Sequence, residues 1–182
     1  FRSYTSWTNT LVFDNTGPGG TNSIRRCDIG VHDGGQASEE IVLLIESIGD
    51  NAQTLQYRAY STDQGSTWSA PAQAPGNSDA FFPELVPGYG GQLWRLWYYS
   101  DGSDRDVYYS RYSGSGNWQE NWGVVTPLAT GSLQEVFPCG WMDDGANRLY
   151  IAALSSTLSP PDPPFGMYST YSTRSTQTTS PT

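Results

Sequence analysis

The sequence predicts an all-β fold, a β-propeller made of about three related four-stranded blades per chain. The first reason is composition: aromatic residues make up 14%, and 20 Gly and 12 Pro supply turns, a combination that favours many short strands. The second is that no stretch shows the apolar period of an amphipathic helix. The third is a segment that recurs three times, with Arg26, Pro83 and Pro138 at equivalent positions. Its spacing of 57 and then 55 residues suits a four-stranded blade.

Each unit is expected to contain its strands in the same order. The first strands, each ahead of a Gly-rich turn, span 23–31, 80–86 and 135–141. The second strands, which are more apolar, span 41–46, 93–99 and 149–154. The third strands span 55–61, 107–112 and 167–172, and fourth strands are predicted at 68–74 and 123–129. The blades are therefore predicted at about 14–76, 77–131 and 132–175.

The two ends of the repeat complement each other. The third unit has no fourth strand, because the chain runs into a Ser/Thr-rich tail at 176–182. A spare strand at 6–13 begins with a Trp, like the two predicted fourth strands. We expect this N-terminal strand to complete the last blade, either in its own chain or in another one, because an unpaired edge invites pairing. Residues 1–175 are then one propeller-type unit.

The charge limits the partners. The net charge is −9, and the nine basic residues are all Arg, which disfavours nucleic acid, whose phosphates need clustered cations. There is no apolar run of 18 residues, so no membrane insertion is predicted. The chain starts at Phe1 without an initiator Met, as expected of a trimmed, secreted product.

The two cysteines and the single histidine indicate no metal centre. Cys27 and Cys139 allow at most one disulfide within a chain and lack the spacing of a zinc site. They stand on first strands of different units, so a disulfide between two chains is an alternative. His32 precedes a Gly-rich turn and is predicted to be a turn residue. The acidic loops 101–106 and 143–145 offer oxygen ligands for Ca²⁺ but lack an EF-hand pattern, so solvated turns are favoured.

One motif has a clear structural explanation. Residues 61–68 read Ser-Thr-Asp-Gln-Gly-Ser-Thr-Trp, with Ser61, Asp63, Gly65, Thr67 and Trp68 at its defined positions. The Asp63 carboxylate can accept backbone N–H bonds across a tight turn, and Gly65 can take a positive φ. Trp68 can close the blade. We therefore predict a folding device and not a catalytic aspartate.

This motif matches the Asp-box, and a worn copy lies at 113–118. Together with the segments 91–97 and 106–111 of the middle unit, it makes residues 6–175 resemble the sialidase-like superfamily of Asp-box (BNR-repeat) β-propellers. The superfamily contains sialidases, other glycosidases, lectins and non-catalytic exported propellers. The resemblance implies a propeller fold and a glycan as a possible partner.

Sialidases gather an arginine triad, a Tyr–Glu pair and an acid/base Asp from six blades, and their first blade often opens with Phe/Tyr-Arg-Ile-Pro. The matching stretch here, 24–27, reads Ile-Arg-Arg-Cys, so an arginine is shifted and the Pro is missing. Arg25 or Arg26 can bind a carboxylate through a bidentate fork. The alternative, which we favour, is a structural salt bridge to Asp28, Glu84 or Glu46.

Three carboxylates lie on or beside the first strands, which line the central channel of a propeller. They are Asp28, Glu84 and Glu135. A pair of them at the right separation can perform acid/base glycoside chemistry. The alternative is that they are solvated channel walls.

The aromatic side chains of the middle unit offer a different kind of site. Trp94, Trp97, Tyr99 and Tyr109 lie on its second and third strands, where alternation points about half of the side chains outward. Exposed Trp and Tyr rings stack on sugars and anchor protein interfaces. The alternative is that they fill the space between blades.

Three functions follow. The preferred one is an exported, non-catalytic propeller that binds carbohydrate or assembles on a surface. The second is a sialidase-like glycoside hydrolase, active as a closed ring of several blades. The third is a structural filament subunit assembled by strand exchange. Self-association, as a dimer or a filament, is expected in each, because three blades are too few to close a ring.

Overall fold

The computed structural model describes residues 12–13, 23–33, 39–48, 53–74, 79–100, 104–114, 116–118, 123–124, 133–143, 148–157 and 166–173. Within these ranges the chain forms three open antiparallel sheets and a single short 3₁₀ turn at Tyr89–Gly91. The predicted all-β class is therefore confirmed. No helix in the described part of the chain has the length and apolarity to cross a membrane.

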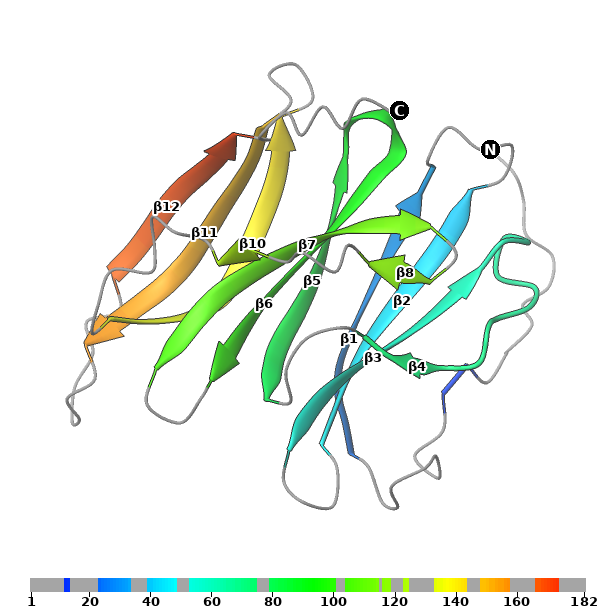
Figure 1. The fold of residues 1–182 in the computed structure, drawn as a ribbon, viewed down its shortest axis with the longest axis horizontal. Coiled ribbons are helices and arrows are strands. Elements are labelled where there is room, and N and C mark those ends of the chain that lie inside the picture. The colour runs from blue at the N-terminus through cyan, green and yellow to red at the C-terminus, as the bar shows by residue number, and fades with distance from the viewer. Residues whose placement is uncertain are drawn as a thin grey trace, which may run out of the picture.

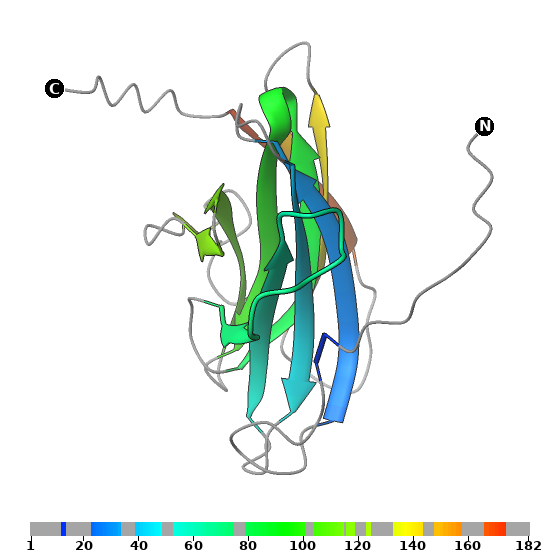
Figure 2. The same cartoon turned by 90° about the vertical axis from the view of Figure 1, so that its right-hand side faces the viewer.

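Sheet 1 consists of β1 (Ser23–His32), β2 (Glu40–Ile48), β3 (Thr54–Ser61) and β4 (Ala72–Gln73), paired in chain order. Sheet 2 consists of β5 (Ala80–Gly88), β6 (Gln92–Ser100), β7 (Arg105–Gly114) and β8 (Asn117–Trp118), and β9 (Gly123–Val124) also pairs with β7. Sheet 3 consists of β10 (Leu133–Asp143), β11 (Arg148–Thr157) and β12 (Gly166–Thr173). Figure 1 shows sheet 2 between sheets 1 and 3, and Figure 2 views the molecule from the side of sheet 1.

The first three strands of each unit lie where the sequence places them, and the fourth strand of the first unit is shorter than predicted. β4 covers two residues of the predicted strand at 68–74, and β9 covers two described residues of the one at 123–129. Pro71, next to β4, has no N–H to donate to a ladder. Of the predicted N-terminal strand at 6–13, only residues 12–13 are described, and they are not in a strand. The tail at 176–182 lies outside the described residues.

Each first strand contains a one-residue bulge. The register against the second strand shifts between Ile24 and Arg26 in β1, between Phe81 and Glu84 in β5, and between Val136 and Cys139 in β10. In β5 and β10 the bulge is a Phe-Pro pair, and both Phe residues have a positive φ, 53° at Phe82 and 54° at Phe137. Bulges bend a strand and redirect its side chains, so the three first strands change direction at the same level.

The core lies between the sheets, in two clusters. Between sheets 1 and 2 the cluster is Val42, Leu44, Ala74, Leu85, Leu93, Tyr112 and Trp118. Between sheets 2 and 3 it is Val86, Trp94, Leu96, Tyr98, Val107, Val136, Met142, Leu149, Ile151 and Ala153. The first strands of neighbouring sheets adjoin, β1 against β5 and β5 against β10.

A glycine permits each close approach between first strands and their neighbours. A Cβ at Gly30 would lie 2.6 Å from Leu93 Cδ1, and a Cβ at Gly140 would lie 2.5 Å from Leu96 Cδ1. Both distances are below any normal carbon contact, so the two sheet interfaces are packed to the limit at these positions.

Candidate functional site at the first-strand bulges

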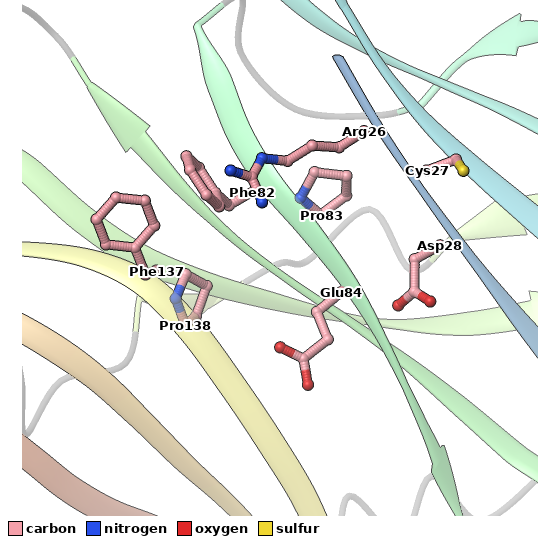
Figure 3. Close-up of a pocket in the computed structure, with 8 residues that line it drawn as sticks. All are labelled: Arg26, Cys27, Asp28, Phe82, Pro83, Glu84, Phe137 and Pro138. Atoms are coloured by element: carbon pink, nitrogen blue, oxygen red, sulfur yellow. The ribbon is translucent and has the colours of Figure 1, made fainter. Parts of the chain in front are cut away.

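The bulges of the three first strands surround one cavity, which we call the first-strand cavity. Its volume is about 310 Å³, within the range of small-molecule sites. It is lined by three residues of β1, three of β5 and two of β10: Arg26, Cys27, Asp28, Phe82, Pro83, Glu84, Phe137 and Pro138 (Figure 3). All three sheets therefore contribute walls to a single site.

One part of the cavity combines a cation with aromatic rings. The guanidinium carbon of Arg26 lies 3.4 Å from the centre of the Phe82 ring, a cation–π contact that Figure 3 shows directly. Phe137 meets Phe82 edge-on, with 4.2 Å between ring centroids. Phe137 is 41% exposed, so it offers an apolar surface to a ligand.

Carboxylates brace the neighbouring sheets beside this part of the cavity. Asp28 Oδ2 accepts the backbone N–H of Leu85 at 2.5 Å, from sheet 1 to sheet 2. Glu84 Oε1 accepts the backbone N–H of Gly140 at 3.0 Å, from sheet 2 to sheet 3. The two bonds are equivalent, since the same position of one first strand bonds the next first strand in both cases. They align Asp28 with Glu84. This structural alignment of β1 differs by one residue from the sequence alignment, in which Arg26 takes the place of Pro83 and Pro138.

A further carboxylate, that of Glu46, accepts a hydrogen bond from the bulge of β5. Glu46 of β2 is buried, and its Oε2 accepts the backbone N–H of Phe82 at 2.5 Å. The bond satisfies an amide that the bulge takes out of the β5–β6 ladder. The positive φ of Phe82 is thus held in place from the neighbouring sheet.

The environment of the cavity shifts the pKa of one carboxyl group, that of Glu84. Burial raises the pKa of Glu84, and the nearby charge of Asp28 raises it further, while the Gly140 N–H lowers it. A half-buried carboxyl with a raised pKa is closer to accepting a proton than an ordinary one. The cavity therefore offers two carboxyl groups beside one guanidinium, with hydrogen-bond acceptors and donors on the same wall.

Three of the five residues that the sequence analysis singled out for catalysis meet in this cavity: Arg26, Asp28 and Glu84. Arg25 is exposed on β1 and does not line it. Glu135 belongs to β10, but its side chain lies outside the description. The contact shown for Arg26 is with the Phe82 ring, and not the favoured salt bridge.

The aromatic residues proposed as ligand contacts lie elsewhere. Trp94 and Trp97 are 8% and 1% exposed, so they fill the core and present no ring face to solvent. Arg95, also buried, stacks on Trp97 with 3.7 Å from its guanidinium carbon to the ring centre. Tyr99 and Tyr109 are partly buried beside Tyr108 and Trp94, respectively. None of the four lines the first-strand cavity.

The residues that the sequence analysis missed are the two Phe-Pro pairs, Phe82-Pro83 and Phe137-Pro138. A proline inside a predicted strand is a signal for a bulge, because it has no ladder donor. Its recurrence at the same place in two units, each time after a Phe, was the sequence feature that marked the site.

The turn at 61–68 has the bonds expected of a folding device. Asp63 Oδ1 accepts the Thr67 N–H at 2.8 Å, and Oδ2 accepts the Thr67 hydroxyl at 2.7 Å. The Ser61 hydroxyl accepts the Gly65 N–H at 2.8 Å, and Trp68 Nε1 donates to the Gly65 carbonyl at 3.1 Å. Gly65 has a φ of 85°. Hydrogen bonds, first from the Thr67 side chain and then from its backbone, lower the pKa of Asp63 to about 2.

A second polar cluster joins sheets 1 and 2 around Tyr112. The Tyr112 hydroxyl donates to Glu40 Oε2 at 2.8 Å and accepts the Gly116 N–H at 2.5 Å. Burial, more than any other cause, raises the pKa of Tyr112. His32, predicted to be a turn residue, is instead the last residue of β1, and its ring packs edge-on against Tyr112 at 5.0 Å.

Metal ligands are not clustered in the part of the chain that the structure describes: no group of three or more His, Cys, Asp or Glu side chains there could hold an ion. The two acidic loops considered for Ca²⁺ lie partly outside the described residues, at 101–103 and at 144–145. Cys27 and Cys139 are free and exposed.

The sequence matches no model of a known protein family, and no curated protein matches it either.

Proposed function

We propose that the chain is an exported, non-catalytic β-propeller module of the sialidase-like kind that binds carbohydrate in the first-strand cavity. The three sheets, their repeated bulges and the Asp63 turn support the propeller part of this proposal. The cavity supports the carbohydrate part, and its chemistry is the observation on which the proposal rests.

Sugars present hydroxyl groups that donate and accept hydrogen bonds, together with apolar C–H faces. The first-strand cavity offers a matching set in about 310 Å³. Arg26 is a donor, Asp28 and Glu84 are acceptors, and the exposed ring of Phe137 provides a flat apolar surface. A few polar groups around an apolar surface are the usual composition of a small-molecule site.

The part played by the carboxylates favours binding over catalysis. Asp28 and Glu84 each accept a backbone N–H of the next sheet, so the fold already uses one oxygen of both groups. The same bond recurs at both sheet interfaces, which is the behaviour of a structural brace that also shapes a pocket wall.

The proposal is tested by applying the full chain to a glycan array and measuring the affinity of a bound sugar by calorimetry. Phe137→Ala is expected to weaken binding about tenfold, the contribution of one aromatic contact. Ile24→Ala, an exposed apolar side chain of β1 that does not line the cavity, is the matched control and should bind normally. Absence of any bound sugar, or equal affinity of both variants, would refute the proposal.

One observation favours a glycoside hydrolase as the second possibility. The raised pKa of Glu84, next to the second carboxyl group of Asp28, is the property that a general acid of a glycoside hydrolase needs. Fluorogenic glycosides test it with the native chain and Glu84→Gln. Sugar release that Glu84→Gln abolishes would replace the non-catalytic proposal with this one.

A further inference from the structure

We propose that two copies of the chain associate head to tail, with the open face of sheet 3 in one copy packed on the open face of sheet 1 in the other. This proposal is independent of what the first-strand cavity binds. It rests on a comparison of the two internal sheet interfaces with the two faces that no other sheet covers within the described residues. On the sheet 1 face, the described Phe13 contacts the ring of Tyr57 in β3.

The inter-sheet hydrogen bonds establish which residues are equivalent. Asp28 bonds Leu85 and Glu84 bonds Gly140, so each first strand presents one face to the sheet before it and one to the sheet after it. On that alignment Ile29 is the counterpart of Leu85 and Gly140. Trp141 is the counterpart of Gly30 and Val86.

These equivalent positions are buried where another sheet of the chain packs on them, and they are exposed to solvent on the outer faces of sheets 1 and 3. Leu85 and Val86 are 7% and 3% exposed, because each faces a neighbouring sheet. Ile29 in sheet 1 and Trp141 in sheet 3 are 59% and 63% exposed. Large apolar side chains therefore stand on positions that the repeat buries wherever a neighbour exists.

Each open face extends beyond a single residue. On sheet 1, Val31 is 44% exposed and follows Ile29 on the same side of β1. Figure 2 looks onto this side of sheet 1. On sheet 3, the Trp141 ring stacks on Tyr150 of β11, with 5.5 Å between centroids. The sheet 1 face thus carries two exposed apolar side chains on its first strand, and the sheet 3 face carries two stacked aromatic rings.

The occupant that fits is a second copy of this chain. The open face of sheet 1 is equivalent to the face of sheet 2 that packs on sheet 1 and to the face of sheet 3 that packs on sheet 2. The open face of sheet 3 is equivalent to the face of sheet 1 that packs on sheet 2 and to the face of sheet 2 that packs on sheet 3. One copy carries one face of each kind, so the contact is heterologous. Two copies bring six sheets together, within the four to eight blades that close a propeller.

The same alignment places the two cysteines near each other across the contact. Cys139 takes the place of Asp28 and Glu84, and Cys27 takes the place of Pro83 and Pro138. Within the chain, the corresponding pairs Asp28–Pro83 and Glu84–Pro138 line one cavity. Cys139 of one copy and Cys27 of the other are therefore expected to lie within the reach of a short bis-maleimide.

The experiment is light scattering of the full chain under reductant over a range of concentrations. The native chain should give twice the 19.9 kDa of one copy. Ile29→Glu and Trp141→Glu should each weaken association at least about thirty-fold, the effect of losing a central interface residue. Asn117→Glu, which adds the same charge at an exposed position of β8 in sheet 2, should leave the pair intact.

Mixing the two variants separates loss of the interface from loss of the fold. The Ile29→Glu chain keeps its sheet 3 face and the Trp141→Glu chain keeps its sheet 1 face, so an equimolar mixture should recover pairs through one intact contact. A native chain that stays single, a variant that pairs with itself, or polymers that lengthen with concentration would each overturn the closed head-to-tail pair.

The cross-link gives an independent reading of the orientation. Bis-maleimide should join two native chains, and either Cys27→Ser or Cys139→Ser should abolish the product. A cross-link that survives in the Cys27→Ser chain would mean that Cys139 faces Cys139, and would overturn the proposal.

Discussion

Gly140 is where the packing of sheet 3 on sheet 2 can be tested most directly. In Gly140→Ala the new Cβ would lie 2.5 Å from Leu96 Cδ1 and 2.7 Å from Val86 Cγ2. Leu96 is fully buried, so its side chain can yield only by disturbing the core. Overpacking of this size costs about 1–3 kcal/mol, and the loss of glycine's backbone freedom returns about 0.5–1 kcal/mol. The free energy of unfolding should therefore fall by up to about 2.5 kcal/mol, and Tm by up to about 10 °C.

A double-mutant cycle tests the cause, measured by urea and thermal unfolding. Leu96→Val removes the colliding Cδ1, so Gly140→Ala should cost about 1 kcal/mol less in that background than in the native chain. Gly30→Ala is the matched control, because its Cβ would collide with Leu93 Cδ1 at 2.6 Å at the other interface. Its cost should be the same whether position 96 carries leucine or valine. An effect of Gly140→Ala that is the same with leucine and with valine at position 96 would refute the packing that we describe.

Three further predictions concern polar groups. The pKa of Asp63 is lowered from 3.8 to about 2, so the native protein loses stability as pH falls through this range. Asp63→Asn should remove that part of the pH dependence of Tm. A pH profile that the substitution leaves unchanged would contradict the capping role. The raised pKa of Glu84 has the opposite effect on the pH dependence of stability. The free energy of unfolding falls as pH rises from 4.5 through the raised pKa, and urea titrations of Glu84→Gln should lack this fall. Tyr112→Phe removes the hydroxyl that bonds Glu40 and the Gly116 N–H and should cost about 1–3 kcal/mol in urea unfolding. A neutral change would argue against the cluster.

The strands were predictable because their side-chain pattern is local. The apolar second strand predicted at 93–99 is observed as Gln92–Ser100, and the one at 149–154 as Arg148–Thr157. The fourth strand of the first unit was overestimated, since β4 keeps only Ala72–Gln73. A fourth strand at the edge of a sheet carries little apolar pattern, and prolines interrupt its pairing, so its length depends on contacts that the sequence does not show.

The site was predictable only in part, because it is made by the packing of three sheets. That Asp28 and Glu84 stand on equivalent strands followed from the repeat, and so did their nearness to Arg26. Their hydrogen bonds to Leu85 and Gly140 depend on the distance between sheets, which periodicity cannot supply. For the same reason the sequence left open whether Trp94 and Trp97 are exposed or fill the core, whereas the exposed ring at the cavity is Phe137.

The departures from the repeat at the two end sheets have a common physical reason. Inside the chain, Asp28 and Glu84 bury part of their charge once, when the chain folds. The same arrangement between two copies would desolvate a carboxylate at every association, at a cost that a single N–H bond repays poorly. Position 139 carries a cysteine instead, and the Ile29 N–H donates to Asp28 Oδ1 of its own strand at 2.8 Å. The end faces therefore combine apolar side chains with an already satisfied backbone amide, which suits a surface that is exposed before assembly and buried after it.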